Sequence, residues 1–180
     1  MLAWIDLEMT GLDLERHVIV EIATLITDDN LDFIYDGPDI VISATDEQLS
    51  EMDDVVIKMH SESGLLEAVK QSTTTLEEAT AQTLEFLRKH VQEGTKVPLC
   101  GNSIGIDRRF LNKYIPELEN FFHYRSIDVS TIKELSKRWF PKVYYQTPKK
   151  NSSHRALDDI KESVEELKYY KNVLFHPIGH

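Results

Sequence analysis

The 180-residue chain contains a single cysteine, Cys100, and this scarcity excludes two kinds of protein. No intrachain disulfide can form, so the chain is not a disulfide-stapled secreted scaffold. A zinc cluster built on several cysteines is excluded for the same reason. We expect Cys100 to be a small buried side chain near the end of a strand, a common environment for a free cysteine.

Long apolar runs are also missing. No stretch approaches the ~18 consecutive apolar residues that a membrane-spanning helix requires, so we expect no membrane partner. The first residues lack a basic segment and reach the acidic Asp6 at once, which is not the pattern of a secretory signal peptide. The sequence therefore predicts a cytoplasmic protein.

Positive charge is in the minority: 20 Lys and Arg stand against 31 Asp and Glu, and the formal net charge is −11. This balance argues against a broad basic face that grips long nucleic acid, although it allows a small local site. From Lys133 to Arg155 there are seven basic residues and one acid, Glu134. Such a segment could hold one or two phosphates, so it favours short substrates; the alternative is a solvated lysine-rich loop.

Length and composition predict one domain spanning residues 1–180. Hydrophobic residues make up 41% of the chain and charged residues 28%, the balance of a globular protein. The apolar segments 1–7, 18–27 and 33–42 follow one another as strands, which predicts an antiparallel meander.

Short predicted strands then alternate with helices. Apolar segments at 97–101 and 124–129 are each followed by a helix signal. The pattern Thr75-Leu76-Glu77-Glu78 is a capping box that opens a helix, and Ser130-Thr131 is expected to cap another. A last helix is predicted from residue 156, capped by the Asn-Ser-Ser run before His154. We therefore expect an α/β fold with a mixed central sheet, antiparallel first and parallel later, flanked by helices.

Two acids stand at the end of the first predicted strand. Asp6 and Glu8 are two residues apart, so their side chains share one face, with Cβ atoms about 7 Å apart. Carboxylates this close repel each other and lose hydration unless a cation lies between them. The pair predicts a metal site, and the alternative is a pair of solvated acids at a strand end.

Two later segments carry further acids. Asp107 follows the 97–101 strand by about one helical turn and could face the same edge of the sheet; it also fits an acid stabilised by a helix dipole. Asp159 is expected on the inner face of the last helix, with His154 at the mouth of that helix. Taken alone, His154 also fits an ordinary surface histidine.

Together these residues form three motifs in order: Asp6-x-Glu8, Asn102-x₄-Asp107 and His154-x₄-Asp159. The set resembles the DEDD exonucleases of the ribonuclease H-like fold, in the subfamily whose third motif is H-x₄-D. Longer strings, at 4–12, 101–103, 123–131 and 153–159, are similar to the oligoribonucleases, and the resemblance covers nearly the whole chain.

The resemblance implies a two-metal 3′→5′ exoribonuclease that hydrolyses very short RNA, dinucleotides above all, to 5′-mononucleotides. Its metal ligands would be Asp6, Glu8, Asp107 and Asp159. Carboxylate oxygens select Mg²⁺ or Mn²⁺, and two such ions can clamp a phosphoryl displacement. His154, with an ordinary pKa near 6.5, suits the general base.

The resemblance also assigns substrate contacts. Leu12 would lie between the two bases of a dinucleotide. Ser103 would hold the 5′ phosphate together with Arg125 and Ser130 supplied by a second copy of the chain. Tyr124 would likewise reach the other copy's active site. A homodimer with shared active sites is therefore expected.

One position departs from the family pattern. After Met52-Asp53-Asp54 the family commonly carries a tryptophan that stacks on a base, and this chain has Val55. The pattern resumes at His60, which the resemblance counts among the substrate contacts.

Two other functions remain open at this point. One is a DNA-directed 3′→5′ exonuclease of the same superfamily, which the same motifs would serve. The other is a non-catalytic acidic protein whose carboxylates bind Ca²⁺ or a basic partner, although no segment has the spacing of an EF-hand loop.

Overall fold

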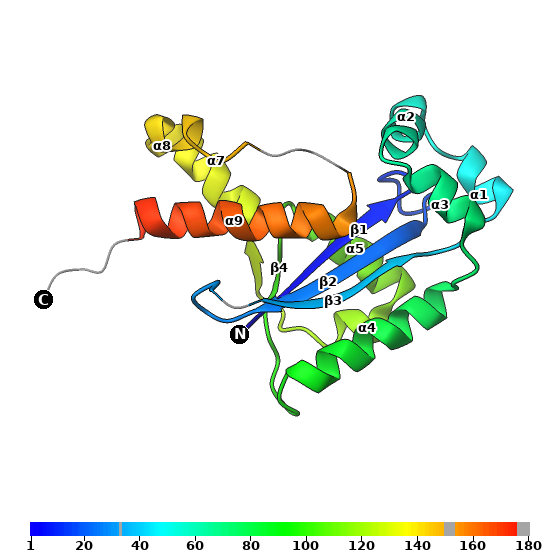
Figure 1. The fold of residues 1–180 in the computed structure, drawn as a ribbon, viewed down its shortest axis with the longest axis horizontal. Coiled ribbons are helices and arrows are strands. Elements are labelled where there is room, and N and C mark those ends of the chain that lie inside the picture. Colours follow the sequence, from blue (N-terminus) through cyan, green and yellow to red (C-terminus); the bar gives the residue numbers. More distant parts are fainter. Residues whose placement is uncertain (33, 150–153, 176–180) are drawn as a thin grey trace, which may run out of the picture.

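A five-stranded sheet forms the centre of the computed structural model, in the order β3-β2-β1-β4-β5 (Figure 1). The structure describes the chain except residues 33, 150–153 and 176–180. The strands are β1 (Leu2–Met9), β2 (Ile19–Thr27), β3 (Ile34–Val41), β4 (Leu99–Gly101) and β5 (Ser126–Asp128).

The pairing confirms the mixed sheet expected from the sequence. Strands β1, β2 and β3 form an antiparallel meander, and β4 and β5 then add parallel to β1. The β1–β4 ladder is short, because it joins Ala3 to Leu99 and Trp4 to Cys100 and goes no further. The second half of β1 therefore has no strand partner on its β4 side.

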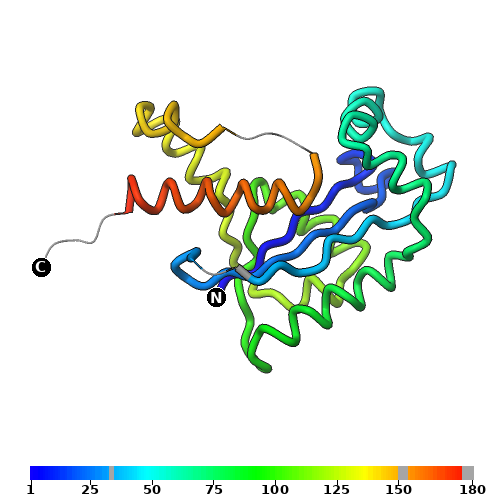
Figure 2. The backbone as a smooth tube through the Cα atoms, viewed as in Figure 1, coloured from blue at the N-terminus to red at the C-terminus, as the bar shows by residue number. Residues whose placement is uncertain are grey.

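Helices cover both faces of this sheet. In chain order they are α1 (Asp46–Ser50), α2 (Asp54–Glu62), α3 (Leu65–Gln71), α4 (Leu76–His90), α5 (Gly105–Tyr114), α6 (Pro116–Glu119), α7 (Val129–Trp139), α8 (Pro141–Tyr145) and α9 (Ala156–Leu174). Figure 1 shows α9 on one face of the sheet and α4 on the other. The chain trace of Figure 2 places α1, α2 and α3 together beyond the end of β1. No helix among the described residues is long and apolar enough to cross a membrane.

The alternation of side chains along β1 divides the core into two parts. Ile5 and Leu7 face the part that contains α4 and α5 residues, whereas Trp4 faces the part built on α9. The Trp4 indole is fully buried, and its N–H donates to Thr27 Oγ1 at 3.1 Å. Cys100 is buried in the same part, as expected for a small apolar side chain.

Several boundaries differ from the sequence predictions for local reasons. Strand β5 begins at Ser126, so Tyr124 lies before it instead of within it. Asp128, and not Ser130, caps α7, because its carboxylate accepts a hydrogen bond from the Ser130 N–H. Pro141 begins α8 at the first helical position, where its missing N–H costs nothing.

The last helix begins at Ala156 as predicted and extends to Leu174. The Asn-Ser-Ser run that the sequence offers as its cap lies outside the described residues. Arg155 is the N-cap residue, and its side chain makes no cap hydrogen bond. The Ala156 N–H instead donates to the carboxylate of Glu21, which reaches it from β2.

The capping box of α4 gives the first testable prediction. Thr75 Oγ1 accepts from the Glu78 N–H at 3.1 Å, and the Glu78 carboxylate accepts from the Thr75 N–H at 2.8 Å. Thr75→Ala should lower the free energy of unfolding by about 1 kcal/mol, because the Glu78 N–H loses the hydroxyl to which it donates. Urea unfolding measures this loss. Thr73→Ala, at an exposed position just before the helix, is the matched control and should change stability by less than about 0.5 kcal/mol.

Candidate active site

Three carboxylates meet where β1 passes beneath the start of α9. Asp6, Glu8 and Asp159 each place one oxygen within 4.8 Å of the others. The period-two geometry of β1 puts the first two on the α9 face, and the first turn of α9 brings the third. The structure thus brings together acids that lie more than 150 positions apart in the sequence.

Asp107 joins this group from α5 through a gap in the sheet. Because β4 does not extend alongside the second half of β1, the Leu7 N–H has no strand partner there. Asp107 Oδ1 accepts a hydrogen bond from that N–H at 3.1 Å, and its side chain is buried. The charge of Asp107 raises the pKa of Asp6, and only burial has a larger effect, so the two carboxylates interact.

Burial and mutual repulsion disfavour the charged forms of these acids. Burial raises the pKa of Asp6 well above its usual range, and the neighbouring carboxylates, Asp107 first, raise it further. Burial likewise raises the pKa of Glu8 to about 8. For Asp107 burial raises the pKa to about 7, against the opposing effect of the Leu7 N–H. Oxygen donors in such an arrangement fit a hard divalent cation, which would stabilise the charged carboxylates.

His154 lies two residues before the start of α9, the helix that carries Asp159. Its side chain is half-buried, and its backbone has φ of +52°, a left-handed conformation that is uncommon for a residue other than glycine. It is near enough to His60 for its charge to lower the pKa of that residue, although burial of His60 is the larger cause. The predicted general base is thus near His60, whose Nδ1 lies 4.0 Å from Glu8 Oε2.

His60, which the resemblance counts among the substrate contacts, lies in the interior. The side chain is fully buried, with Nε2 at 2.9 Å from the Met9 carbonyl oxygen and Nδ1 at 4.0 Å from Glu8 Oε2. Hence Nε2 is the protonated nitrogen when the ring is neutral, since a carbonyl only accepts. The ring therefore lies against Glu8 and exposes no surface of its own.

Ser103 and Ser130 come together within one chain. The Ser103 N–H donates to Ser130 Oγ at 2.8 Å and to Asp128 Oδ1 at 2.9 Å, and the two hydroxyl oxygens are 3.1 Å apart. Ser130 Oγ also donates to Asn102 Oδ1 at 3.1 Å. The expectation that Ser130 reaches Ser103 from a second copy is therefore wrong, because β4 and β5 are neighbours in the sheet.

Tyr124 and Arg125 lie elsewhere. Both are exposed just before β5, and the Arg125 guanidinium lies 5.1 Å from the centre of the Tyr124 ring. Ser126 is level with Leu99, and Leu99 with Ala3. Asp6 stands three residues further along β1, roughly 10 Å away along the strand. The structure does not bring Tyr124 and Arg125 to the carboxylates of their own chain.

Leu12, in the loop after β1, and Val55, at the start of α2, are both exposed. Leu12 projects from a tight loop in which Gly11 lies against the ring of His17, and an added Cβ would come within 2.3 Å of that ring. The loop is closed by the Asp13 N–H, which donates to His17 Nδ1 at 2.9 Å. Val55, where the family commonly has tryptophan, lies in the first turn of α2.

The basic segment from Lys133 to Arg155 is less available to a substrate than its composition indicates. Lys133 pairs with the buried Glu166 at 3.2 Å, and Arg138 pairs with Glu134. Arg155 pairs with Glu21 at 2.6 Å. Three of the seven cations thus already have acidic partners, and Lys150 lies outside the described residues.

Among the described residues, Glu21 is a functional candidate that the sequence reasoning missed. It lies on β2 directly opposite Glu8 and is fully buried. The signal in the sequence is an acid in the middle of an otherwise apolar, β-branched strand, at Val18-Ile19-Val20-Glu21-Ile22.

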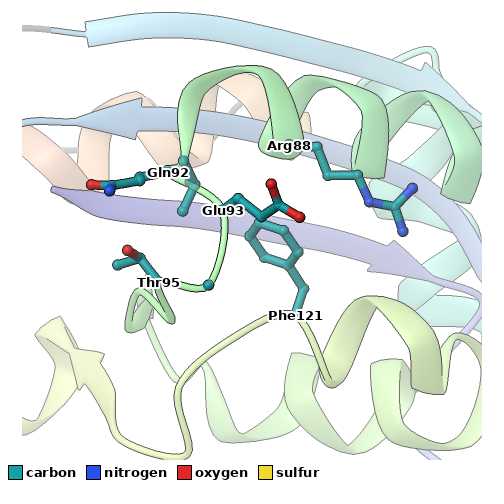
Figure 3. A pocket seen from close by; sticks show the side chains of 7 residues that line it. Arg88, Gln92, Glu93, Thr95 and Phe121 are labelled. Atoms are coloured by element: carbon teal, nitrogen blue, oxygen red, sulfur yellow. The ribbon is translucent and has the colours of Figure 1, made fainter.

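A hollow of about 380 Å³ lies at the opposite end of the sheet, between the end of α4 and the segment that leads to β5. Figure 3 shows Phe121 pointing toward Glu93 there, with Arg88 directed away along the helix. Its lining contains no pair of carboxylates that could share a cation. We assign it no part in the chemistry.

The raised pKa values predict how stability depends on pH when no metal is present. A carboxyl whose pKa is higher in the folded chain stabilises the fold while protonated, and that stabilisation is lost as the pH rises. The stabilisation is lost over the pH range between the ordinary pKa and the pKa in the folded chain. This range runs from 4.5 to about 8 for Glu8 and from 3.8 to about 7 for Asp107. In EDTA the melting temperature should fall by several degrees between about pH 5 and pH 8.

Scanning calorimetry measures this slope. Asp107→Asn keeps an oxygen for the Leu7 N–H and removes one titrating group, so the slope should become shallower. Saturating Mn²⁺ should raise the melting temperature most at the alkaline end. A melting temperature that rises with pH in EDTA would contradict the prediction.

Comparisons with known proteins agree with this geometry. Residues 3–167 match the model of the exonuclease family. An oligoribonuclease from Escherichia coli (strain K12) is 57% identical over 170 residues, which cover 94% of this chain and 93% of the relative. An oligoribonuclease from Corynebacterium diphtheriae is 54% identical over 170 residues, covering 94% of this chain and 81% of the relative.

A solved structure shares the fold at much lower identity. The nuclease domain of 3′hExo, a DEDDh family member bound to rAMP, superposes with a TM-score of 0.61 at 15% identity, covering 99% of this chain and 96% of that one. The likeness confirms the ribonuclease H-like architecture, and family membership implies divalent metal ions. With the carboxylates, the motif order and these relatives in agreement, the chain belongs to the exonuclease family and, within it, to the oligoribonucleases.

Proposed function

We propose that the chain is a 3′→5′ exoribonuclease that hydrolyses very short RNA, dinucleotides above all, to nucleoside 5′-monophosphates. The observation that carries the proposal is the meeting of Asp6, Glu8 and Asp159 within 4.8 Å, with Asp107 in the same group and His154 beside it. The relatives' name, oligoribonuclease, supports RNA fragments as the substrate. The domain would span residues 1–180.

Two Mg²⁺ or Mn²⁺ ions are proposed as the cofactors, held by Asp6, Glu8, Asp159 and Asp107. All of these ligands offer carboxylate oxygen, which favours hard cations over zinc. When bound, the ions would supply charge stabilisation at the attacking and leaving oxygens of the phosphodiester.

His154 is the proposed general base. It would take a proton from the attacking water, whose oxygen forms the new bond to phosphorus while the 3′ oxygen of the preceding nucleotide leaves. Its position at the junction with α9 keeps it beside Asp159. Half-burial leaves the ring in contact with the open side, where the water and the substrate would lie.

The hydroxyls of Ser103 and Ser130 are proposed to receive the 5′ phosphate of the substrate. Ser103 is exposed and Ser130 is half-buried, and contacts with Asp128 and Asn102 hold the two side by side. The Ser130 hydroxyl already donates to Asn102, so Ser103 would be the first to donate to a phosphate. Leu12 is proposed to separate the two bases. The net charge of −11 supports a short substrate in preference to a long strand.

A homodimer is proposed to complete the site. Tyr124 and Arg125 lie too far along the sheet to serve their own chain, but they are exposed just before the edge strand β5, where a second copy could meet them. The segment from the end of α7 through α8 also exposes the large apolar side chains of Trp139, Phe140 and Tyr145. Exposed apolar side chains of this kind support an interface with a second copy.

Two alternatives have less support. A DNA-directed exonuclease would use the same carboxylates, and the names of the relatives favour RNA. A non-catalytic acidic protein would account for metal binding and not for His154 beside the ligands. We also propose that the protein works in the cytoplasm, where its single buried cysteine would stay reduced.

Cleavage of the dinucleotide pApA tests the proposed function. Wild-type protein should release AMP in Mg²⁺ or Mn²⁺ and stop in excess EDTA. Asp159→Ala should reduce cleavage by at least about 10³-fold, because a ligand that acts at the reacting phosphate is lost. Asp158→Ala is the matched control, since this neighbouring acid is exposed, and it should retain most of the activity.

The shared site is tested by mixing two inactive variants. Tyr124→Ala chains keep the carboxylates, and Asp6→Ala chains keep the tyrosine. One site of each mixed dimer would carry neither change, so mixing should restore part of the pApA cleavage. A fully active monomer in analytical ultracentrifugation would refute the shared site and leave the proposed reaction standing.

A further inference from the structure

The Glu21 carboxylate occupies a position where burial is energetically unfavourable. It is fully buried on β2, directly across from Glu8 in the antiparallel ladder. Residues directly opposite each other share one face, and like charges in that relation destabilise a sheet. A buried carboxylate also loses hydration, so it persists only with strong partners.

Those partners come from the start of α9. Arg155 Nε donates to Glu21 Oε1 at 2.8 Å, and a second guanidinium nitrogen lies 2.6 Å from the same oxygen. The other oxygen, Oε2, accepts from the Ala156 N–H at 2.9 Å. Both carboxylate oxygens of one β2 residue therefore bind two consecutive residues at the beginning of the helix.

These contacts flank the residues of the site. His154 precedes Arg155 and adopts the left-handed conformation that turns the chain into α9. Asp159 lies one turn later, and its N–H donates to the Arg155 carbonyl oxygen at 3.0 Å. The same arginine thus contacts the sheet through its side chain and Asp159 through its backbone.

Other charged groups surround Arg155 without replacing Glu21. Asp39 on β3 and Asp158 on α9 add weaker electrostatic attraction. Lys161, further along α9, forms an ion pair with Asp36 at 3.5 Å, and both of its members are partly exposed. This second link between α9 and the sheet has the same chemistry and lies away from the carboxylates.

We propose that Glu21 and Arg155 are positioning residues that seat the first turn of α9 on the sheet and so set where His154 and Asp159 stand relative to Asp6 and Glu8. The inference rests on the proposed function for its catalytic consequence. Its structural consequence concerns the metal-free chain and can be measured without any reaction. The rival explanation is an ordinary buried ion pair. Its loss would lower the stability of the fold and leave the position of the site residues unchanged.

The test compares Arg155→Met, Arg155→Lys and the control Lys161→Met. In metal-free protein, hydrogen exchange of the segment 154–162 should speed up by at least about 10-fold in Arg155→Met, since loss of the anchor allows local opening. Mn²⁺ affinity should weaken about 10-fold. The kcat for pApA at saturating Mn²⁺ should fall by about 10²-fold, the usual effect of a displaced catalytic group, while KM changes less than about threefold.

The other variants separate positioning from stability. Arg155→Lys keeps the charge and should recover part of both the exchange protection and kcat, whereas Lys161→Met should stay within about twofold of wild type in every readout. If Arg155→Met folds poorly, the double variant Glu21→Gln/Arg155→Met removes both charges, keeps an oxygen for the Ala156 N–H and restores measurable folding. We expect this double variant to keep a low kcat for pApA and a weak affinity for Mn²⁺.

Two outcomes would overturn the inference. One is a folded Arg155→Met protein with wild-type exchange, Mn²⁺ affinity and kcat. The other is a double variant that regains kcat and Mn²⁺ affinity together with stability. If instead wild-type protein binds Mn²⁺ but leaves pApA intact, the proposed function fails, and the exchange and Mn²⁺ measurements still decide the role of Arg155.

Discussion

The repulsion between carboxylates that the fold holds together, away from water, is the constraint on which the rest of the site depends. Asp6, Glu8 and Asp159 bring their oxygens within 4.8 Å of one another, and Asp107 adds a further buried charge. Burial raises the pKa of Glu8 to about 8. A sheet and a helix that impose this arrangement lose stability as the acids ionise, and they gain affinity for a divalent cation for the same reason.

Two acids that face each other across β1 and β2 meet this constraint in different ways. Glu21 is enclosed by Arg155 and the Ala156 N–H, with three contacts between 2.6 and 2.9 Å. Glu8 has the buried ring of His60 at 4.0 Å and belongs to the trio of possible ligands. One carboxylate is therefore used to attach a helix, and its neighbour is left for a cation.

The topology of the sheet supplies the remaining polar contacts. Because β4 is short, the Leu7 N–H is available to Asp107, and the loop after β4 can meet the start of α7. Gly101 at this strand end lies so close to β1 that an added Cβ would be 3.2 Å from the Ile5 carbonyl oxygen. The same architecture recurs in a nuclease domain that is 15% identical, since a fold depends on the pattern of apolar positions more than on their identities.

The sequence by itself determined the features that depend on local periodicity: the meander, the capping box at Thr75 and the three acidic motifs with their order. Period-two and helical spacing act over a few residues and can be read directly. Only the tertiary structure decided that Ser103 meets Ser130 in one chain, that His60 is buried and that Glu21 binds Arg155. Ser103 and Ser130 are 27 positions apart, His60 and its partner Met9 are 51 apart, and Glu21 and Arg155 are 134 apart. Their geometry depends on how β4, β5 and the start of α9 pack against β1 and β2, which no local pattern encodes.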